Sequence, residues 1–181
     1  MQPLLSRWDR TARVDVFRLD ASMPDYASRI GRPIDSYFFA QDASAGSFLV
    51  GVGPDRARAN DLYERTLYGA GYARGPASDV LIIGLGGAPD VLTALHFGAR
   101  HIDAVDINRT TIEMVRHEFR DFLGDPYGQP GVYTHAMDGR TFLRQSPRTY
   151  DLIQMSGVEP SRSSRRGHSR STRTPSTRRR R

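Results

Sequence analysis

The sequence predicts an α/β protein built around a parallel sheet, and three observations lead to this prediction. Short apolar runs alternate with helical patterns between residues 78 and 156. A glycine-rich turn joins one apolar run to the helical pattern that follows it, and Asp106 ends the next apolar run. Strands that alternate with helices favour a parallel sheet with right-handed crossovers, which is a Rossmann-like arrangement.

The first part of the chain predicts a small β lobe that precedes the α/β region. Three short β-like runs occur there, separated by turn residues, at residues 14–19, 36–39 and 47–52. Alternating polarity and turn residues favour an antiparallel sheet or hairpin. A short helix is expected over residues 60–70, with Asn60 as its N-cap.

The α/β region predicts four strands, near residues 79–84, 102–107, 131–136 and 150–155, and three helices, near 89–98, 110–123 and 139–145. The second helix has the clearest signals, because residues 110–113 match a capping box and apolar residues follow at helical spacing. A doubly wound domain usually has about six strands. Either the domain is minimal or the sequence lost its C-terminal half. If the sheet is cut short, its last strand is an exposed apolar edge, which favours poor solubility.

The composition excludes several kinds of site. The chain has no cysteine, which excludes disulfides, zinc–thiolate sites and cysteine nucleophiles. All 26 basic residues are arginine, so a Schiff-base lysine and a P-loop lysine are excluded as well. The five histidines lack the spacing of metal ligands, and no apolar run is long enough for a signal peptide or a membrane helix. We expect a cytoplasmic protein without a metal and without membrane association.

The basic charge is concentrated in residues 161–181, which hold nine arginines and no acid. Residues 1–160 carry 17 arginines against 20 carboxylates, a net charge of −3. The Arg/Ser/Thr tract cannot bury an apolar face and is expected to be disordered. Its abrupt start suggests out-of-frame reading of a GC-rich gene and a C-terminally truncated domain. The tail could contact nucleic acid through phosphates, but its lack of aromatic residues favours a tail without that role.

These features divide the chain into an N-terminal β lobe (1–58), a truncated nucleoside-binding domain (59–160) and the basic tail (161–181). The first candidate site is the glycine turn formed by Gly84, Gly86 and Gly87. Glycines let the backbone approach a ligand, and the following helix N-terminus favours polar or anionic groups. Pro89 replaces the third glycine of the dinucleotide fingerprint, which disfavours a dinucleotide. The alternative is a tight turn without a ligand.

Three carboxylates near strand ends need separate interpretations. Asp106 lies 22 residues after Gly84, where a carboxylate can accept hydrogen bonds from ribose hydroxyls. Asp138, followed by Gly139, comes after the third strand and can accept from an adenine amine, cap the next helix, or do both. Asp103 is expected at the surface or the sheet edge. The pattern thus predicts an adenosine-type ligand, with an ordinary N-cap or solvated acid as the alternative for Asp106.

Five segments, in this order and spacing, resemble the spermidine/spermine synthase family: VLIIGLGG (80–87), DVLTAL (90–95), AVDIN (104–108), DGRTFL (138–143) and YDLI (150–153). The resemblance implies the class I methyltransferase fold. It also implies decarboxylated S-adenosylmethionine or S-adenosylmethionine as the donor and a small-molecule amine or other acceptor. In that arrangement the glycine turn shapes the site, Asp106 holds the ribose, and Asp138 and Gly139 meet the adenine. A homodimer is left open.

The chain departs from the family after the fourth strand. Polyamine synthases of the family carry an Asp-x-x-Asp-Pro loop there, whose first Asp helps to deprotonate the attacking amine. Here Ser156 and Glu159 occupy the two acid positions and are the candidate catalytic residues. A serine cannot take up an ammonium proton near neutral pH without a partner base.

The function expected is a spermidine synthase-like transferase for polyamine biosynthesis, with aminopropyl transfer in intact relatives. Two alternatives stay open. One is an S-adenosylmethionine-dependent methyltransferase that uses the same nucleoside site. The other is a non-catalytic fragment whose basic tail binds nucleic acid.

Overall fold

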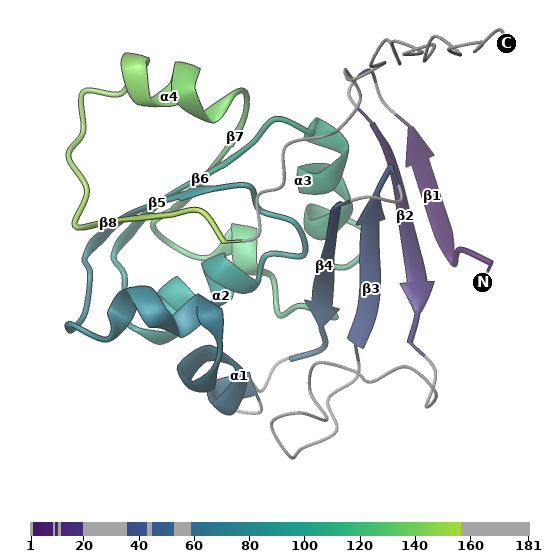
Figure 1. Cartoon of the computed structure of the whole chain (residues 1–181), viewed down its shortest axis with the longest axis horizontal. Helices are drawn as coiled ribbons and strands as arrows, with labels where there is room; N and C mark the ends of the chain where they lie inside the picture. Colours follow the sequence, from purple (N-terminus) through teal and green to yellow (C-terminus); the bar gives the residue numbers. More distant parts are fainter. Residues whose placement is uncertain are drawn as a thin grey trace, which may run out of the picture.

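The residues that the structure describes form two four-stranded sheets, one antiparallel and one parallel (Figure 1). The computed structural model describes residues 2–8, 10, 12–19, 36–42, 45–52 and 59–156. The predictions for Glu159 and for the tail at 161–181 lie outside the described residues. Within the described ranges, none of the helices has both the length and the apolar character needed to cross a membrane.

The antiparallel sheet consists of β1 (Leu5–Trp8), β2 (Arg13–Arg18), β3 (Ser36–Gln41) and β4 (Ala45–Val50), paired in chain order. The expected antiparallel lobe is therefore confirmed, with one more strand than the sequence indicated. Inward-facing residues alternate along β2, where Val14 and Val16 are fully buried. Val16 lies opposite Phe39 of β3, so the two strands present one apolar face.

Two short helices replace the single helix expected after the lobe. They are α1 (Asn60–Arg65) and the 3₁₀ helix η3 (Leu67–Tyr72). The prediction of Asn60 as the N-cap is wrong, because Asn60 is already helical and the capping position is Ala59, which has no side-chain cap. The extended backbone of Thr66 separates the two helices, and its hydroxyl oxygen accepts the Tyr68 amide at 3.3 Å.

The parallel sheet contains β5 (Asp79–Ile83), β6 (His101–Asp106), β7 (Val132–Ala136) and β8 (Leu152–Gln154) in the order β7-β6-β5-β8. The intervening helices are α2 (Pro89–His96), α3 (Arg109–Arg116), the 3₁₀ helix η4 (Pro126–Gly128) and α4 (Gly139–Gln145). All adjacent pairs are parallel, as the sequence predicts. β8 is an edge strand of this sheet, also as predicted, with Ile153 about half exposed.

Helix α3 begins differently from the prediction. Asn108 is its N-cap, and the Asn108 side chain accepts the amide of Thr110 at 2.9 Å. The capping box predicted over residues 110–113 is therefore wrong. The Glu113 carboxylate instead pairs along the helix surface with Arg109 and His117. The regular helix also ends at Arg116, before the predicted end at residue 123.

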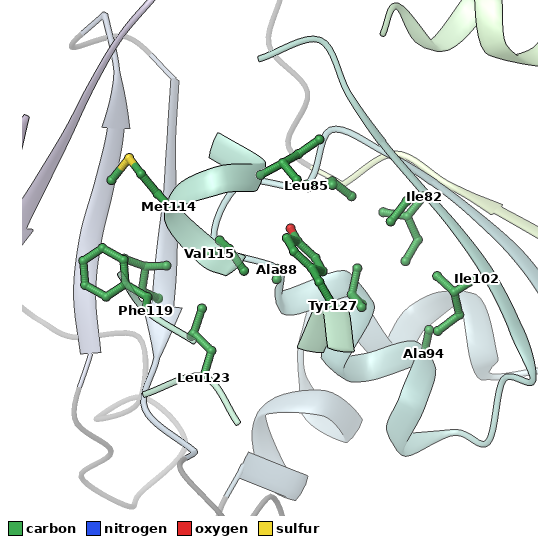
Figure 2. Packing of buried hydrophobic residues seen from close by; sticks show 14 of the residues in the cluster. Ile82, Leu85, Ala88, Ala94, Ile102, Met114, Val115, Phe119, Leu123 and Tyr127 are labelled. Carbon is green, nitrogen blue, oxygen red and sulfur yellow. The ribbon is translucent and has the colours of Figure 1, made fainter. Parts of the chain in front are cut away.

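One hydrophobic cluster joins the two sheets, with α2 and α3 between them (Figures 1 and 2). It includes Val16 and Phe39 from the antiparallel sheet and Ile82 and Ile102 from the parallel sheet. On the opposite face of the parallel sheet, Phe142 of α4 covers a second cluster. The shared core fixes the antiparallel sheet beside α2 and the turn that precedes it, which positions the candidate site.

Candidate functional site

The described candidate site residues gather at one edge of the parallel sheet. Gly84 follows β5, Asp106 ends β6, Asp138 follows β7 and Ser156 follows β8. Because these four strands are parallel, their carboxyl ends share one edge, where α/β proteins bind ligands. The structure thus brings these residues to one place on the fold.

Asp106 organises the centre of this edge. It is 8% exposed, and its Oδ2 accepts the backbone amide of Leu85 in the glycine turn at 2.8 Å. Its Oδ1 accepts the backbone amide of Asn108, the N-cap of α3, also at 2.8 Å. Asp106 therefore ties the turn after β5 to the start of α3.

The glycine turn packs against β4. Gly86 has a φ of +48°, and a Cβ at this position would lie 2.7 Å from the Ser47 side chain. A Cβ on Gly87 would clash with the carbonyl oxygen of Phe48, and the Gly87 amide donates to Ser47 Oγ at 3.2 Å. These contacts with β4 leave no room for a side chain at either position, so they alone explain both glycines. Close approach by a ligand, which the sequence suggested, is therefore not needed to explain them.

Asp138 caps helix α4. Its Oδ1 accepts the backbone amide of Thr141 at 2.9 Å and the Thr141 hydroxyl at 3.0 Å. The bonds from the Thr141 amide and hydroxyl lower the pKa of Asp138, so the exposed carboxylate is anionic. A Cβ on Gly139 would lie 2.6 Å from Ile83 Cγ2, which shows how closely α4 starts beside the end of β5. The capping role proposed for Asp138 is present, and an adenine contact is compatible with it.

Ser156 contacts a carboxylate that the sequence analysis did not assign to the site. Its Oγ lies 2.5 Å from both carboxylate oxygens of Asp90, in the first turn of α2. Gln154 Nε2 also donates to Asp90, and to the Tyr68 carbonyl at 3.1 Å. Asp90 is 2% exposed, and this burial raises its pKa to about 6, although both hydrogen bonds oppose the shift. An acid within an apolar helical pattern, just after the glycine turn, was the signal that could have identified it.

Asp103 is the centre of a buried polar network, so the prediction that it lies at the surface or edge is wrong. It is 5% exposed and accepts from His101 Nε2 at 2.8 Å, His135 Nε2 at 2.7 Å and the Tyr150 hydroxyl at 2.9 Å. Burial alone would raise the pKa of Asp103, but these three bonds together lower it. The network faces α4, on the side of the sheet opposite α2 and α3.

A cavity of about 390 Å³ lies apart from these residues, between the end of α3 and η4. Its lining contains none of the predicted site residues: Arg116, His117, Arg120, Asp125, Tyr127 and Gly128. In the part of the chain that the structure describes, no group of three or more His, Asp and Glu side chains is arranged to hold a metal ion.

The order of the parallel strands and the turn bound by Asp106 define a Rossmann-like domain of the class I methyltransferase type. The family model described as "Spermine/spermidine synthase domain" matches residues 60–172, more than half of the chain. The chain therefore belongs to the spermine/spermidine synthase family, as the sequence motifs indicated. A search of curated proteins gives no match.

Solved structures of spermidine synthases share the fold, and two of them illustrate the match. Spermidine synthase from Thermotoga maritima matches with a TM-score of 0.61 and 17% identity, covering 88% of this chain and 48% of that chain. A spermidine synthase in complex with the transition-state analogue AdoDATO matches with the same TM-score, identity and coverage of this chain, and with 47% of its own length. The chain thus spans about half the length of these structures.

Proposed function

We propose that this domain binds the adenosine part of decarboxylated S-adenosylmethionine or S-adenosylmethionine at the carboxyl edge of the parallel sheet. The observation that carries the proposal is Asp106, which is buried at the end of β6 and hydrogen-bonded to both the glycine turn and the start of α3. This carboxylate is the group expected to accept hydrogen bonds from the ribose hydroxyls.

The chemistry of the edge fits such a ligand. Two carboxylates lie along it, Asp106 at the end of β6 and Asp138 at the start of α4. Acceptors of this kind suit a ribose diol and an exocyclic amine. They do not suit a pyrophosphate, which agrees with the missing third glycine of the dinucleotide fingerprint.

Family membership supports aminopropyl transfer as the reaction. An amine nitrogen attacks the carbon bonded to the sulfonium, the carbon–sulfur bond breaks, and methylthioadenosine leaves. The contribution of the protein is to hold the donor in position and to remove a proton from the attacking amine. We propose Asp106, Asp138 and Gly139 for the first task, and Ser156 and Glu159 for the second.

Calorimetric titration with S-adenosylmethionine, its decarboxylated form and methylthioadenosine tests this proposal. Tighter binding of the decarboxylated form supports aminopropyl transfer, whereas tighter binding of S-adenosylmethionine supports methyl transfer. We expect Asp106→Asn to weaken binding more than tenfold, because the ribose would lose a charged acceptor.

Asp151→Asn is the matched control. Asp151 also accepts two backbone amides, those of Ser78 and Asp79 at 2.9 and 3.0 Å, but at the amino end of β5. Its loss should leave nucleoside affinity unchanged. A folded protein that binds none of the three compounds would contradict the proposed function.

A further inference from the structure

The contact between Asp90 and Ser156 supplies what the sequence lacks at the family's acid position. We infer that the two residues act together as the proton acceptor for the attacking amine, with Ser156 facing the amine and Asp90 behind it. The inference rests on the proposed function and adds to it Asp90, a residue on α2.

The geometry supports a pair that works as one unit. Ser156 Oγ lies 2.5 Å from each carboxylate oxygen of Asp90, so its single hydroxyl proton is held by one or the other. Ser156 is partly exposed after β8, whereas Asp90 is 2% exposed beneath it. Since β8 pairs with β5, and α2 follows β5, the contact lies at the carboxyl edge beside the glycine turn. An amine arriving there would meet the serine first.

The surroundings of Asp90 keep its carboxylate basic. Among the described residues no arginine or histidine pairs with it, and the donors to its carboxylate are neutral: the side chains of Ser156 and Gln154 and its own backbone amide. Burial raises the pKa of Tyr72 of η3, and the charge of Asp90 raises it further. Burial also raises the pKa of Tyr127 of η4, with smaller contributions from the charges of Asp106 and Asp90. Figure 2 shows the Tyr127 hydroxyl pointing toward Leu85 and the glycine turn.

Burial without a cationic partner raises the pKa of Asp90 to about 6. A base of that strength is ionised near neutral pH and still accepts a proton readily, which is the compromise that general-base catalysis favours. An ordinary surface carboxylate, with a pKa of about 4, would be a poorer acceptor.

The proton transfer balances without a further reagent. As the amine nitrogen bonds to the carbon next to the sulfonium, the carbon–sulfur bond breaks and its electron pair stays on sulfur. The nitrogen loses a proton to Ser156 Oγ while the Ser156 hydroxyl proton passes to Asp90. The products are the alkylated amine, a neutral thioether nucleoside and a protonated Asp90, which then returns its proton to solvent.

The test is the pH dependence of methylthioadenosine formation from decarboxylated S-adenosylmethionine and 1,4-diaminobutane. We expect the kcat of the unaltered chain to rise with an apparent pKa near 6, the value at Asp90. Asp90→Asn and Ser156→Ala should each lower kcat about 100-fold or more, which is the scale of general-base catalysis. Asp90→Asn should also abolish the rise of kcat with pH near 6.

Nucleoside affinity, measured by calorimetry, should stay unchanged in both variants. Ser156→Asp should restore turnover in the Asp90→Asn background, because it places a carboxylate directly before the amine.

Asp103→Asn is the matched control, because it also removes a buried carboxylate that accepts from a hydroxyl, but on the opposite face of the sheet. This variant should keep both the kcat of the unaltered chain and its rise with pH near 6. If Asp90→Asn keeps them as well, the pair only ties β8 to α2 and the inference is overturned. Nucleoside binding without any methylthioadenosine formation would also overturn the inference while leaving the nucleoside site intact. Absence of nucleoside binding would overturn the proposed function and, with it, this inference.

Discussion

Replacing Asp106 with alanine tests how far one carboxylate holds the candidate site together. Asp106→Ala removes the acceptor for two buried backbone amides, those of Leu85 and Asn108. An unsatisfied buried donor costs about 1–3 kcal/mol, so the two together should cost roughly 3 kcal/mol of unfolding free energy. For a domain of this size 1 kcal/mol shifts the melting temperature by about 2–4 °C, which predicts a fall of about 9 °C.

Thermal unfolding followed by circular dichroism measures this loss. Asp106→Asn is the informative companion variant, because its carbonyl oxygen can keep one of the two amides while its NH₂ group faces the other. It should fall between the unaltered chain and Asp106→Ala. A melting temperature within about 2 °C of the unaltered protein for Asp106→Ala would refute the reasoning, since the two amides would then have found other partners.

Three further predictions concern the fold around the site. Gly87→Ala should destabilise the protein by about 2 kcal/mol, measured by urea unfolding, because the new methyl group meets the Phe48 backbone; an unchanged midpoint would show that β4 can move away. Burial raises the pKa of Asp90 to about 6, above the unfolded value of about 4, so ionisation of Asp90 destabilises the fold as the pH rises through this range. Asp90→Asn removes this cost and should stabilise the fold by roughly 1–3 kcal/mol at pH 8. An Asp90→Asn variant that is no more stable at pH 8 than at pH 5, relative to the unaltered chain, would contradict this sign. The pKa of Asp103 is lowered in the folded protein, so the ionised carboxylate stabilises the fold at any pH above its pKa of about 4 in the unfolded chain. This stabilisation is lost as the pH falls through the lower pKa of the folded protein. Asp103→Asn should remove that part of the acid dependence, and an unchanged acid profile would count against the network.

Much of the α/β region was predictable because its signals are local. Apolar runs bounded by turns gave the four parallel strands, and their alternation with helices gave their direction. Strand β1 was missed because its four residues mix apolar and polar types without a clear period. The two cap predictions, at Asn60 and Thr110, failed because several residues near each helix start can serve as a cap, and the backbone geometry selects among them.

The position of a candidate site residue was predictable from the sequence only where the end of one strand was enough to place it. Asp106 ends β6 and Asp138 comes two residues after β7, so the parallel pairing of these strands brings both to one edge. The contacts between Gly87 and Ser47 and between Asp90 and Ser156 join residues 40 and 66 positions apart, and no local pattern encodes them. Asp103 was misjudged for the same reason, because two of its three polar partners are distant in sequence, His135 on a neighbouring strand and Tyr150 after α4.

The central claim is that a nucleoside binds at the carboxyl edge of the parallel sheet, and amide chemical-shift mapping tests it residue by residue. We would titrate the ¹⁵N-labelled chain with methylthioadenosine and follow its backbone amides. We expect saturable shifts at Gly84, Leu85, Asn108 and Gly139, around the carboxylates of Asp106 and Asp138. Shifts confined to the cavity between α3 and η4, or no shifts in a folded sample, would contradict it.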